Sequence, residues 1–506
     1  MSTATITRPR PGRAGDRLRA LPRRSRERIA LAGLALGAVW TFFAVPTYPS
    51  YDASYALLWG RELLHGATPS FSAYRAPTEH PLAIALGALL EPVGAAADRA
   101  LVAVALAAFV ALVGGLYRLG RDSFSPAVGV AAALLLCGGL HFESLALRGY
   151  ADVAFLALVV WAGALEAERS RRGVAVLALL AAAGLIRPDA WLLSALYAGW
   201  LARSTPGRGA RLRLAALALL APAAWSAFDA ALTGDPLFSL HATHGLAGEL
   251  GRRRDLGEVV RLVPVYLLGA LSPPVAAAAL AGLGAALALA PRRAVLPAVG
   301  LLSGLISFLL VGLFGLSVIP RYLVVAQVAL VLFAGLALAG FTLLSWGTRA
   351  RRLWALGAAL ALLAAAGLDL AHAAPRSLLA DVRLRSADHV ALGRLLDRPA
   401  VRAGLGCGAV SVPDHRLVPE VRWALDLGRT AVVARSDRRQ GWLSAPRPRA
   451  RAQRGVAIFV TDAGARARLL GASAQDPRIG VPRVGFTRVA EEAPFVAYAA
   501  CPRPPG

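Results

Sequence analysis

Residues 28–82 read RIALAGLALGAVWTFFAVPTYPSYDASYALLWGRELLHGATPSFSAYRAPTEHPL. The first part is apolar, and about 20 apolar residues in a helix cross the roughly 30 Å hydrocarbon layer of a bilayer. The second part contains tyrosines, a tryptophan and a concentration of ionisable residues, among them Asp52, Glu62, His65, Arg75, Glu79 and His80. A membrane helix followed directly by such a loop predicts a membrane protein with a functional site at one face of the bilayer.

The composition of the whole chain agrees with this interpretation. Of its 506 residues, 57% are hydrophobic, which is typical of a polytopic membrane protein. The formal net charge of +25 comes from arginine alone, because the sequence contains no lysine. The arginines cluster between apolar runs, so the charge indicates membrane topology and not a nucleic-acid surface. No nucleic-acid partner is expected.

The apolar runs predict how often the chain crosses the membrane. We expect a mainly α polytopic protein with about eleven transmembrane helices: 28–46, 99–118, 125–142, 151–166, 173–187, 189–203, 213–231, 272–290, 294–315, 321–345 and 353–372. Residues 81–94 and 258–271 are also apolar, but they are short and flanked by proline. We expect helices at or dipping into the interface there.

The arginine-rich connectors predict the topology. Short cytoplasmic loops carry the excess of positive charge, so these connectors should lie on the same side as the basic N-terminus. Residues 173–203 must then cross twice, as two short helices that meet at Arg187-Pro188-Asp189, where proline favours a break. A single kinked helix is the alternative. The connectors predicted to be cytoplasmic are 117–122, 166–173, 202–213, 291–293 and 347–352.

This topology divides the chain into three parts. Residues 1–27 form a cytoplasmic basic tail, since they lack the features of a removable signal peptide. Residues 28–372 form a transmembrane domain with an outer loop at 47–98, and residues 373–506 form an extracytoplasmic domain. The arginine-only, alanine-rich composition is typical of a GC-rich bacterial genome, so the expected location is a bacterial plasma membrane.

The last 130 or so residues are predicted to form a small soluble α/β domain. Short β-rich runs occur at 408–414, 430–436, 455–462 and 494–500, and segments such as 388–397 are helical in pattern. Cys407 and Cys501 both lie in this part. They form a disulfide if the domain is outside the cell, and the alternative is two unpaired thiols.

The outer loop 47–98 contains the first candidate site residues. Apolar residues in 52–64 follow helical spacing, which predicts an amphipathic helix along the outer membrane surface with Asp52 at its start. Asp52 is either a catalytic carboxylate or the helix N-cap. Glu79 and His80 either line the same pocket or serve the start of the helix at Pro81. The concentration of ionisable groups in one loop favours the functional interpretation.

Two further pairs are predicted on the outer side. Arg148 and Asp152 flank the start of the fourth crossing, either as substrate-binding residues or as an interface anchor pair. Arg187 and Asp189 lie where two short helices meet, and ionisable residues within membrane segments are functional candidates by default. A mutual salt bridge is the alternative for this pair.

The remaining candidates lie later in the chain. Arg321 and Tyr322 open the tenth crossing, where both residue types are also common interface anchors. His241 and His244 have His-x-x-His spacing, which suits a metal ion, although histidines in loops are usually only solvated. No metal ligand set is assigned, and a divalent metal remains an open alternative.

Together these motifs resemble the GT-C superfamily of glycosyltransferases over roughly residues 28–345. The resemblance rests on an acid soon after the first helix (Asp52), a His-Pro that enters the next helix (His80-Pro81), an Arg-Pro-acid turn (Arg187-Pro188-Asp189) and a late Arg-Tyr (Arg321-Tyr322). The protein O-mannosyltransferase and aminoarabinose-transferase types, which use a polyprenyl-phosphate sugar, are the most similar. Asp52 lacks the adjacent second acid of the mannosyltransferase Asp-Glu pair.

The resemblance implies an inverting glycosyltransferase at the outer face of the membrane. It would use a polyprenyl-phosphate-linked sugar as donor and a glycan, lipid or protein as acceptor. Asp52 would deprotonate the acceptor. Arg187, together with Arg321 or Arg148, would stabilise the departing phosphate, and the other candidates would orient the substrates.

Two other classes of function are compatible with the composition. A transporter or lipid flippase would lack covalent chemistry, but transporters usually place polar residues near the bilayer midplane, whereas here they gather at one face. An assembly factor would use its outer domain to bind a partner in the cell wall. The sequence has no phosphate-binding GxxxxGK[ST] loop and no Gly-rich nucleotide fingerprint, which disfavours ATP-driven transport and cytoplasmic nucleotide-sugar chemistry.

Overall fold

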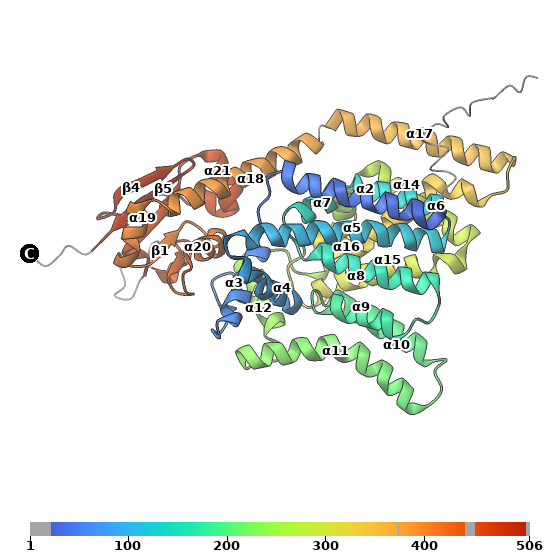
Figure 1. Ribbon diagram of the computed structural model, residues 1–506, viewed down its shortest axis with the longest axis horizontal. Coiled ribbons are helices and arrows are strands. Elements are labelled where there is room, and N and C mark those ends of the chain that lie inside the picture. The colour runs from blue at the N-terminus through green and yellow to red at the C-terminus, as the bar shows by residue number, and fades with distance from the viewer. Residues whose placement is uncertain (1–21, 373, 441–450, 502–506) are drawn as a thin grey trace, which may run out of the picture.

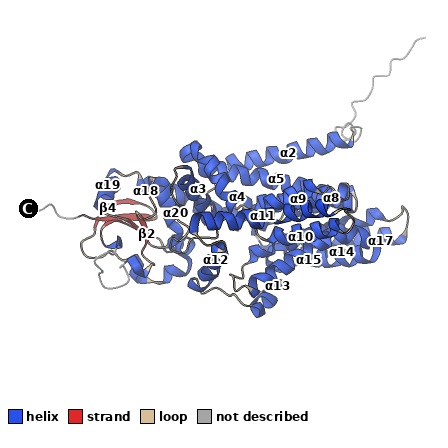
Figure 2. Cartoon of the chain, turned by 90° about the horizontal axis from the view of Figure 1, so that it is seen from below, coloured by secondary structure: helices blue, strands red, loops and turns tan. Residues whose placement is uncertain are grey.

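The computed structural model describes residues 22–372, 374–440 and 451–501. Helices that lie side by side form the larger part of the molecule, and an α/β part follows at one end (Figures 1 and 2). Residues 1–21 of the predicted tail and residue 373 at the predicted domain boundary lie outside the described residues.

The helical part contains the following elements: α2 (Arg23–Ala44), α3 (Tyr51–Leu64), α4 (Pro81–Leu90), η1 (Glu91–Ala96), α5 (Ala97–Ser123), α6 (Pro126–Cys137), α7 (Leu140–Leu147), α8 (Asp152–Glu168), α9 (Val174–Gly184), α10 (Asp189–Ala202), α11 (Arg208–Thr233), α12 (Phe238–Glu249), α13 (Leu256–Leu271), α14 (Pro273–Leu289), α15 (Pro291–Leu313), η2 (Pro320–Leu323), α16 (Val324–Ala339), η3 (Gly340–Leu343) and α17 (Arg349–His372).

The protein is a multi-pass membrane protein. Within the described residues, five helical segments are long and apolar enough to cross a membrane, or up to seven if each of two bent helix pairs counts as one span. The predicted count of eleven is therefore not confirmed. Several predicted crossings correspond to shorter helices, with 17 residues in α8, 11 in α9 and 14 in α10.

Helix breaks explain where the predicted and observed helices differ. The predicted crossing 125–142 ends at Cys137, and α7 follows at an angle of 60°. Helices α13 and α14 meet at 108°, with Ser272 in the left-handed region at φ +60°. Residues 173–203 form two helices, α9 and α10, as the preferred prediction had it, instead of one kinked helix.

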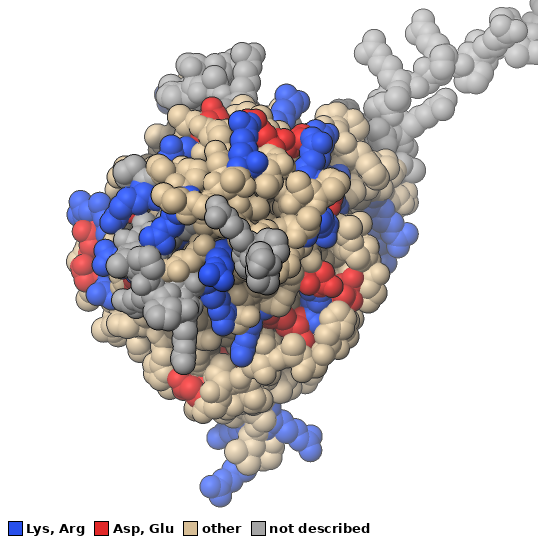
Figure 3. Space-filling model, turned by 90° about the vertical axis from the view of Figure 1, so that its left-hand side faces the viewer, with Lys and Arg blue, Asp and Glu red and all other residues tan. Residues whose placement is uncertain are grey.

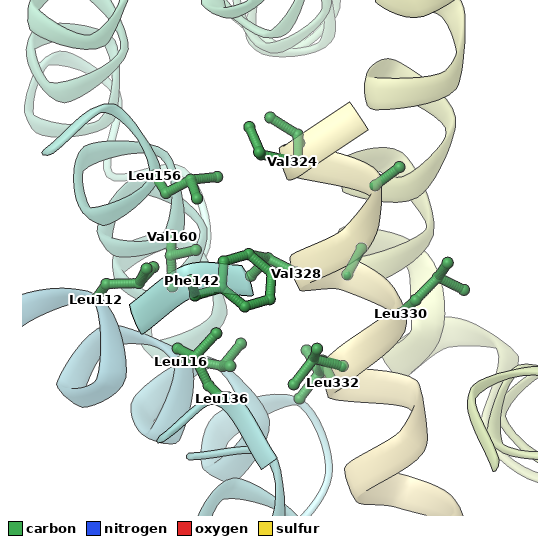
Figure 4. Close-up of a cluster of buried hydrophobic side chains, with 14 of the residues drawn as sticks. Leu112, Leu116, Leu136, Phe142, Leu156, Val160, Val324, Val328, Leu330 and Leu332 are labelled. Atoms are coloured by element: carbon green, nitrogen blue, oxygen red, sulfur yellow. The ribbon is translucent and has the colours of Figure 1, made fainter. Parts of the chain in front are cut away.

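The core of the helical part is built around α16, whose side chains are almost all buried. Val324, Val328 and Leu332 face residues of α5, α6 and α8, with the ring of Phe142 from α7 among them (Figure 4). At Gly282 on α14, an added Cβ would collide with the backbone carbonyl of Phe333 on α16. Glycine there allows the close approach of backbones that is common between membrane helices.

Helix α3 forms as predicted, but its apolar face packs inside the protein and not along the membrane surface. Tyr55, Leu58 and Trp59 are at most 1% exposed. Gly60 on α3 and Gly87 on α4 let the two helices touch through their backbones, since a Cβ at either position would collide with the other helix. This contact fixes the helix that carries Asp52.

The α/β part contains a five-stranded sheet in the order β2-β1-β3-β5-β4. β1, β2 and β3 are parallel, whereas β5 runs antiparallel to β3 and to β4. Four of the strands lie where the sequence predicted them, and β4 is additional. The elements are α18 (Ala374–Leu396), α19 (Pro399–Gly404), η4 (Leu405–Cys407), β1 (Val410–Val412), η5 (His415–Leu417), α20 (Val418–Leu425), β2 (Val432–Ala434), η6 (Arg438–Gln440), η7 (Arg451–Gln453), β3 (Gly455–Val460), α21 (Ala463–Leu470), η8 (Gly471–Gln475), η9 (Pro477–Gly480), β4 (Thr487–Glu492) and β5 (Phe495–Ala500).

A disulfide joins Cys407 to Cys501, which resolves the two alternatives left by the sequence. It connects η4 to the residue after β5 and closes a loop that contains most of the α/β part. Figure 3 views the molecule from this end and shows arginine side chains spread over its surface, with acidic groups between them.

Polar contacts attach the α/β part to the outer loop of the helical part. Arg422 of α20 lies 2.5 Å from Glu62 of α3 and donates to Ser70. Arg61 of α3 pairs with Asp426 at 3.0 Å. These buried and half-buried bonds link residues some 360 positions apart, so the α/β part is docked on α3 and does not hang from a single linker.

Candidate active site

A cavity of about 520 Å³ lies between the helical part and the α/β part. The two parts contribute about equally to its charged wall. Its tyrosine, histidine and charged lining residues are Tyr48, Tyr51, Asp52, Arg75, His141, Arg148, Tyr150, Arg252, Arg321, Tyr322, Arg385, Asp388, His389, His415, Arg416 and Glu420. Four of the residues predicted from the sequence are among them: Asp52, Arg148, Arg321 and Tyr322.

Asp52 faces this cavity because another residue caps its helix. Ser50 is the N-cap of α3 and accepts a hydrogen bond from the backbone of Ala53. The backbone N–H of Ser50 in turn donates to the carbonyl of Arg148. The carboxylate of Asp52 therefore does not serve as the N-cap. It pairs with the guanidinium of Arg321, with a distance of 2.5 Å between Oδ2 and Nη1.

Behind this pair lies a chain of alternating charges. Arg321 is 3.9 Å from Asp152, and Asp152 forms an ion pair with Arg187. Arg187 also contacts Asp189 at 3.0 Å. The chain Asp52, Arg321, Asp152, Arg187, Asp189 thus joins four separate elements, and its inner members are almost completely buried. Asp152 pairs with Arg187. The interface-anchor alternative would require Asp152 to pair with Arg148 instead.

The break between α9 and α10 positions Arg187. Its backbone N–H bonds to the carbonyl of Ala183, so the residue lies just beyond the last turn of α9. The guanidinium stacks against the rings of Phe155 and Tyr322, at 5.2 and 5.1 Å from their centres. Tyr322 lines the cavity, so Arg187 lies directly behind the cavity wall and does not line it.

His80 is half-buried, lies close to the ion-pair chain and does not line the cavity. Burial lowers the pKa of His80 to about 4, although the nearby carboxylates of Asp52 and Asp152 oppose the shift. The imidazole is therefore neutral at pH 7. Its Nδ1 is buried and has no hydrogen-bond partner among the described residues. The sequence placed His80 on the pocket, whereas in the structure it is not among the residues that line the cavity.

The side chain of Glu79 lies near Asp229 and not at the cavity. It is 1% exposed and does not line the cavity, contrary to the expected position. Burial raises the pKa of Glu79 to about 8, and the charge of Asp229 adds to the shift. The neighbouring Thr78 bonds Thr243 of α12, which does line the cavity. Glu79 thus supports the segment behind one cavity wall.

The weak metal candidates do not converge. His241 bonds Asp235 at 2.7 Å, and His244 bonds the backbone carbonyl of Phe314 at 3.0 Å. The part of the chain that the structure describes contains no group of three or more His, Cys, Asp or Glu side chains arranged to hold a metal ion.

The sequence missed several residues that complete the cavity. Arg252 follows α12, and His415 and Arg416 follow β1 of the α/β part. His415 packs edge-on against the ring of Tyr51 at 5.5 Å, next to Asp52. One general signal existed, since ligands of α/β sheets bind beyond the carboxyl ends of the parallel strands. The docking of that edge on α3 could not be read from the sequence.

A second cavity lies deeper among the membrane helices. It has a volume of about 680 Å³ and is bounded mainly by apolar residues of α5, α8, α9, α10, α15 and α16. Leu156 and Val325 are among its lining residues. They lie four residues, or about one helical turn, beyond Asp152 and Arg321. A polar head group at the charged site could therefore place an apolar chain among these helices.

Comparisons with known proteins support the fold. Neither a protein-family model nor a curated protein sequence matches the chain. The crystal structure of ArnT from Cupriavidus metallidurans in the apo state is similar, with a TM-score of 0.56 and 16% sequence identity. The match covers 94% of this chain and 99% of that chain. The resemblance to the aminoarabinose-transferase type of GT-C protein is thus confirmed at the level of the fold.

Proposed function

Starting from this shared fold, we propose that the protein is a membrane glycosyltransferase that transfers a sugar from a polyprenyl-phosphate donor. The observation that carries the proposal is the pairing of Asp52 with Arg321 on the wall of a cavity rich in arginine. The site offers a carboxylate for proton abstraction and guanidinium groups for an anion, which are the two functions this reaction requires.

In the proposed reaction, the acceptor hydroxyl loses its proton to Asp52 and attacks the anomeric carbon of the donor. The bond between that carbon and the phosphate oxygen breaks, and polyprenyl phosphate leaves as an anion. A single displacement inverts the anomeric centre. The leaving group is a stable anion, so the site needs no separate general acid.

Arg321 would link the two functions. In the substrate-free structure its guanidinium neutralises Asp52. A donor phosphate bound at Arg321 would compete for the same guanidinium and release the carboxylate toward the acceptor. Asp152, Arg187 and Asp189 would hold Arg321 in place from behind, and His80 would lie beside them as a neutral side chain.

The apolar cavity supports a lipid donor. Its lining residue Val325 follows Arg321 by about one helical turn, so an apolar chain could extend from a phosphate at Arg321 into the bundle. We further propose that the charged cavity faces the extracytoplasmic side, because the arginine-rich connectors lie at other ends of the helices. The lipid donor would then be dissolved in the bilayer and would enter the cavity from it.

Purified protein in nanodiscs, incubated with a radiolabelled polyprenyl-phosphate sugar and a cell-envelope extract as the source of acceptors, tests the proposal. Asp52→Asn should reduce sugar transfer by at least about 100-fold, because the general base is lost. Asp235→Asn, the same change in an outer loop away from the cavity, should leave transfer intact. Undiminished transfer by Asp52→Asn would contradict the mechanism, and transport of the lipid without transfer would favour the flippase alternative.

A further inference from the structure

Two polar side chains, Asp414 and His415, lie just beyond the carboxyl end of β1. The three parallel strands lie in the order β2-β1-β3, so the chain leaves β1 toward β2 and later returns on the other side of β1 as β3. In parallel sheets, ligands bind beyond the carboxyl ends of the strands at the point where the strand order reverses in this way. The topology therefore places Asp414 and His415 where a ligand is expected.

Asp414 is a completely buried carboxylate with contacts to both of its oxygens. Oδ1 accepts the backbone N–H of Arg416 at 3.1 Å, and Oδ2 accepts the hydroxyl of Ser473. Nδ1 of His415 lies 2.6 Å from Oδ1. Burial raises the pKa of Asp414, but these three contacts outweigh burial and hold the pKa below its ordinary value. The side chain is therefore ionised at neutral pH and can only accept hydrogen bonds.

The carboxylate determines which nitrogen of the neutral imidazole carries the proton. An oxygen anion at 2.6 Å repels a lone pair on Nδ1 and attracts an N–H there. The proton of His415 is thus on Nδ1, and the lone pair is on Nε2. Nε2 makes no hydrogen bond among the described residues. A histidine arranged in this way can accept a hydrogen bond from a ligand through Nε2.

Two tyrosines hold the imidazole ring in place at the cavity wall. The ring of Tyr51 lies 5.5 Å from that of His415 and the ring of Tyr74 lies 6.1 Å away, both in edge-on arrangements. His415 is only 7% exposed, yet it lines the cavity. Its side chain is therefore already ordered before a ligand binds, which lowers the entropic cost of binding.

Two other histidines on the cavity wall are arranged differently. His389 lies between Glu420, at 2.5 Å from Nδ1, and Asp98, at 3.3 Å from Nε2, so both of its nitrogens are occupied. Nε2 of His141 is buried. His415 differs from both, because a carboxylate holds one nitrogen and leaves the other free.

We propose that Asp414 and His415 form a dyad that binds a hydroxyl group of a substrate, with Nε2 of His415 as the hydrogen-bond acceptor. The nature of the substrate rests on the proposed function, since a sugar is rich in hydroxyl groups, whereas the orientation of the imidazole does not. The arginines on the cavity wall only donate hydrogen bonds, so a hydroxyl that donates its own proton needs an acceptor such as Nε2. The hydroxyl belongs either to the donor sugar or to the acceptor.

Chemical labelling of the full-length protein in zwitterionic nanodiscs tests the dyad without a substrate. Diethyl pyrocarbonate modifies an imidazole nitrogen that has a lone pair, and mass spectrometry locates the product. Asp414→Asn keeps the shape of the side chain but removes the negative charge that makes Nε2 basic. Modification of His415 should therefore slow by about threefold or more relative to His65, whose side chain is 61% exposed.

Asp437→Asn is the matched control for this change. Asp437 follows β2, is buried and accepts the backbone N–H of Arg439 at 3.0 Å, as Asp414 does with Arg416. No histidine pairs with Asp437 among the described residues. Equal labelling of His415 in Asp414→Asn and Asp437→Asn would overturn the dyad. Unfolding of Asp414→Asn would speed the labelling of His415, so it is not mistaken for the expected result.

The kinetics of sugar transfer test the contact with a hydroxyl group. His415→Asn keeps an N–H donor near Asp414 but removes Nε2, whereas His415→Gln can place an amide oxygen at the position of Nε2. The Asn variant should raise the half-saturating concentration of one substrate by roughly three- to tenfold, as expected for loss of one neutral hydrogen bond. The Gln variant should recover part of this loss. Titrating the polyprenyl-phosphate sugar and the acceptor extract separately shows which of them supplies the hydroxyl.

The maximal rate separates substrate binding from a role in the chemical step. It should change little in His415→Asn. A lower maximal rate at unchanged half-saturating concentrations would overturn the proposal, and so would kinetics equal to those of the wild type. If the labelling of His415 depends on Asp414 but the wild type transfers no sugar, the proposed function fails and the dyad stands.

Discussion

Asp52 and Arg321 form a 2.5 Å ion pair, although they lie at opposite ends of the helical part of the sequence. The pair is only partly exposed, with 19% of the Asp52 side chain and 26% of the Arg321 side chain accessible. It links the outer loop to η2 and places a carboxylate and a guanidinium on one cavity wall. Two quantities can be measured: the coupling free energy between Asp52 and Arg321, and the free energy of unfolding after a change in the charges behind them.

The ion pair predicts that substitutions of its two members are not additive. In a double-mutant cycle of Asp52→Asn and Arg321→Gln, the coupling free energy should be roughly 0.5–3 kcal/mol, because the residues contact each other directly. Denaturant unfolding in detergent measures it. The cycle of Asp52→Asn with Arg148→Gln is the control, since Arg148 lines the same cavity without bonding Asp52. Equal coupling in both cycles would mean that the pair is not specific.

The buried charges behind the pair predict a large loss of stability when Arg187 is removed. Arg187→Met leaves the carboxylate of Asp189 without its ion-pair partner and that of Asp152 with only the more distant Arg321, at 3.9 Å, which should destabilise the protein by roughly 3–5 kcal/mol. Arg203→Met, an exposed arginine at the end of α10, should change the free energy of unfolding far less.

A compensating variant separates this electrostatic explanation from a packing defect. Adding Asp152→Asn and Asp189→Asn to Arg187→Met removes the two carboxylate charges that Arg187 balances in the wild type while keeping the shapes of the side chains. Unfolding measurements should then show partial recovery of stability. If the triple variant is less stable than Arg187→Met, the destabilisation arises from packing and the charge chain is not its cause.

A site residue could be predicted from the sequence where its immediate neighbours mark it as unusual, and not where only tertiary packing brings it to the cavity. Asp52 and Arg187 stand out in the sequence because each is an ionisable residue beside an apolar run, and that contrast is local. Glu79 is equally conspicuous, yet it lies beside Asp229, since the direction of a loop side chain depends on the packing of α11 and α12. Arg416 carries no local signal at all, because it reaches the cavity through the docking of a separate part of the chain.

The same distinction holds for the fold. The β-rich segments of the last 130 residues were recognised because strand periodicity is local, and four of the five strands were placed correctly. The eleven predicted crossings are not confirmed, since fewer of the described helices are long enough to span, and hydropathy does not show breaks such as the 60° bend after Cys137. Ser50, not Asp52, caps α3, and both residue types are good caps in the sequence.

Glu79 predicts a pH dependence of stability in the neutral range. Its pKa is about 8 in the folded protein, against an ordinary value of 4.5, because burial disfavours the carboxylate. Between pH 4.5 and 8 the unfolded chain releases this proton while the folded protein retains it, so stability should fall as the pH rises through that window. Thermal unfolding of the wild type between pH 5 and 8.5 measures the effect.

Glu79→Gln isolates this contribution. The amide resembles the protonated acid, so the variant should match the wild type near pH 5 and be more stable near pH 8. Glu258→Gln, a change at a half-buried acid at the start of α13, should not alter the pH dependence. A wild type and Glu79→Gln with parallel pH profiles would show that Glu79 ionises normally in the folded state.

His389, at the contact between the two parts, predicts a loss of stability at alkaline pH. It lies between Glu420 of α20, at 2.5 Å, and Asp98 of α5, at 3.3 Å. Burial lowers its pKa, but the hydrogen bonds to the two carboxylates outweigh this and raise the pKa of His389 to about 10. The imidazolium is thus present at pH 7 and attaches α18 and α20 to the membrane helices.

Because the folded-state pKa lies above the ordinary value of 6.5, the stabilisation is complete below pH 6.5, declines as the pH rises and is lost above about pH 10. His389→Gln should lower the unfolding temperature at pH 6 and remove most of the decline between pH 7 and 10. His241→Gln, an exposed histidine that also pairs with an acid, is the control and should follow the wild type. If His389→Gln also follows the wild type, the imidazolium of His389 does not stabilise the contact between the two parts.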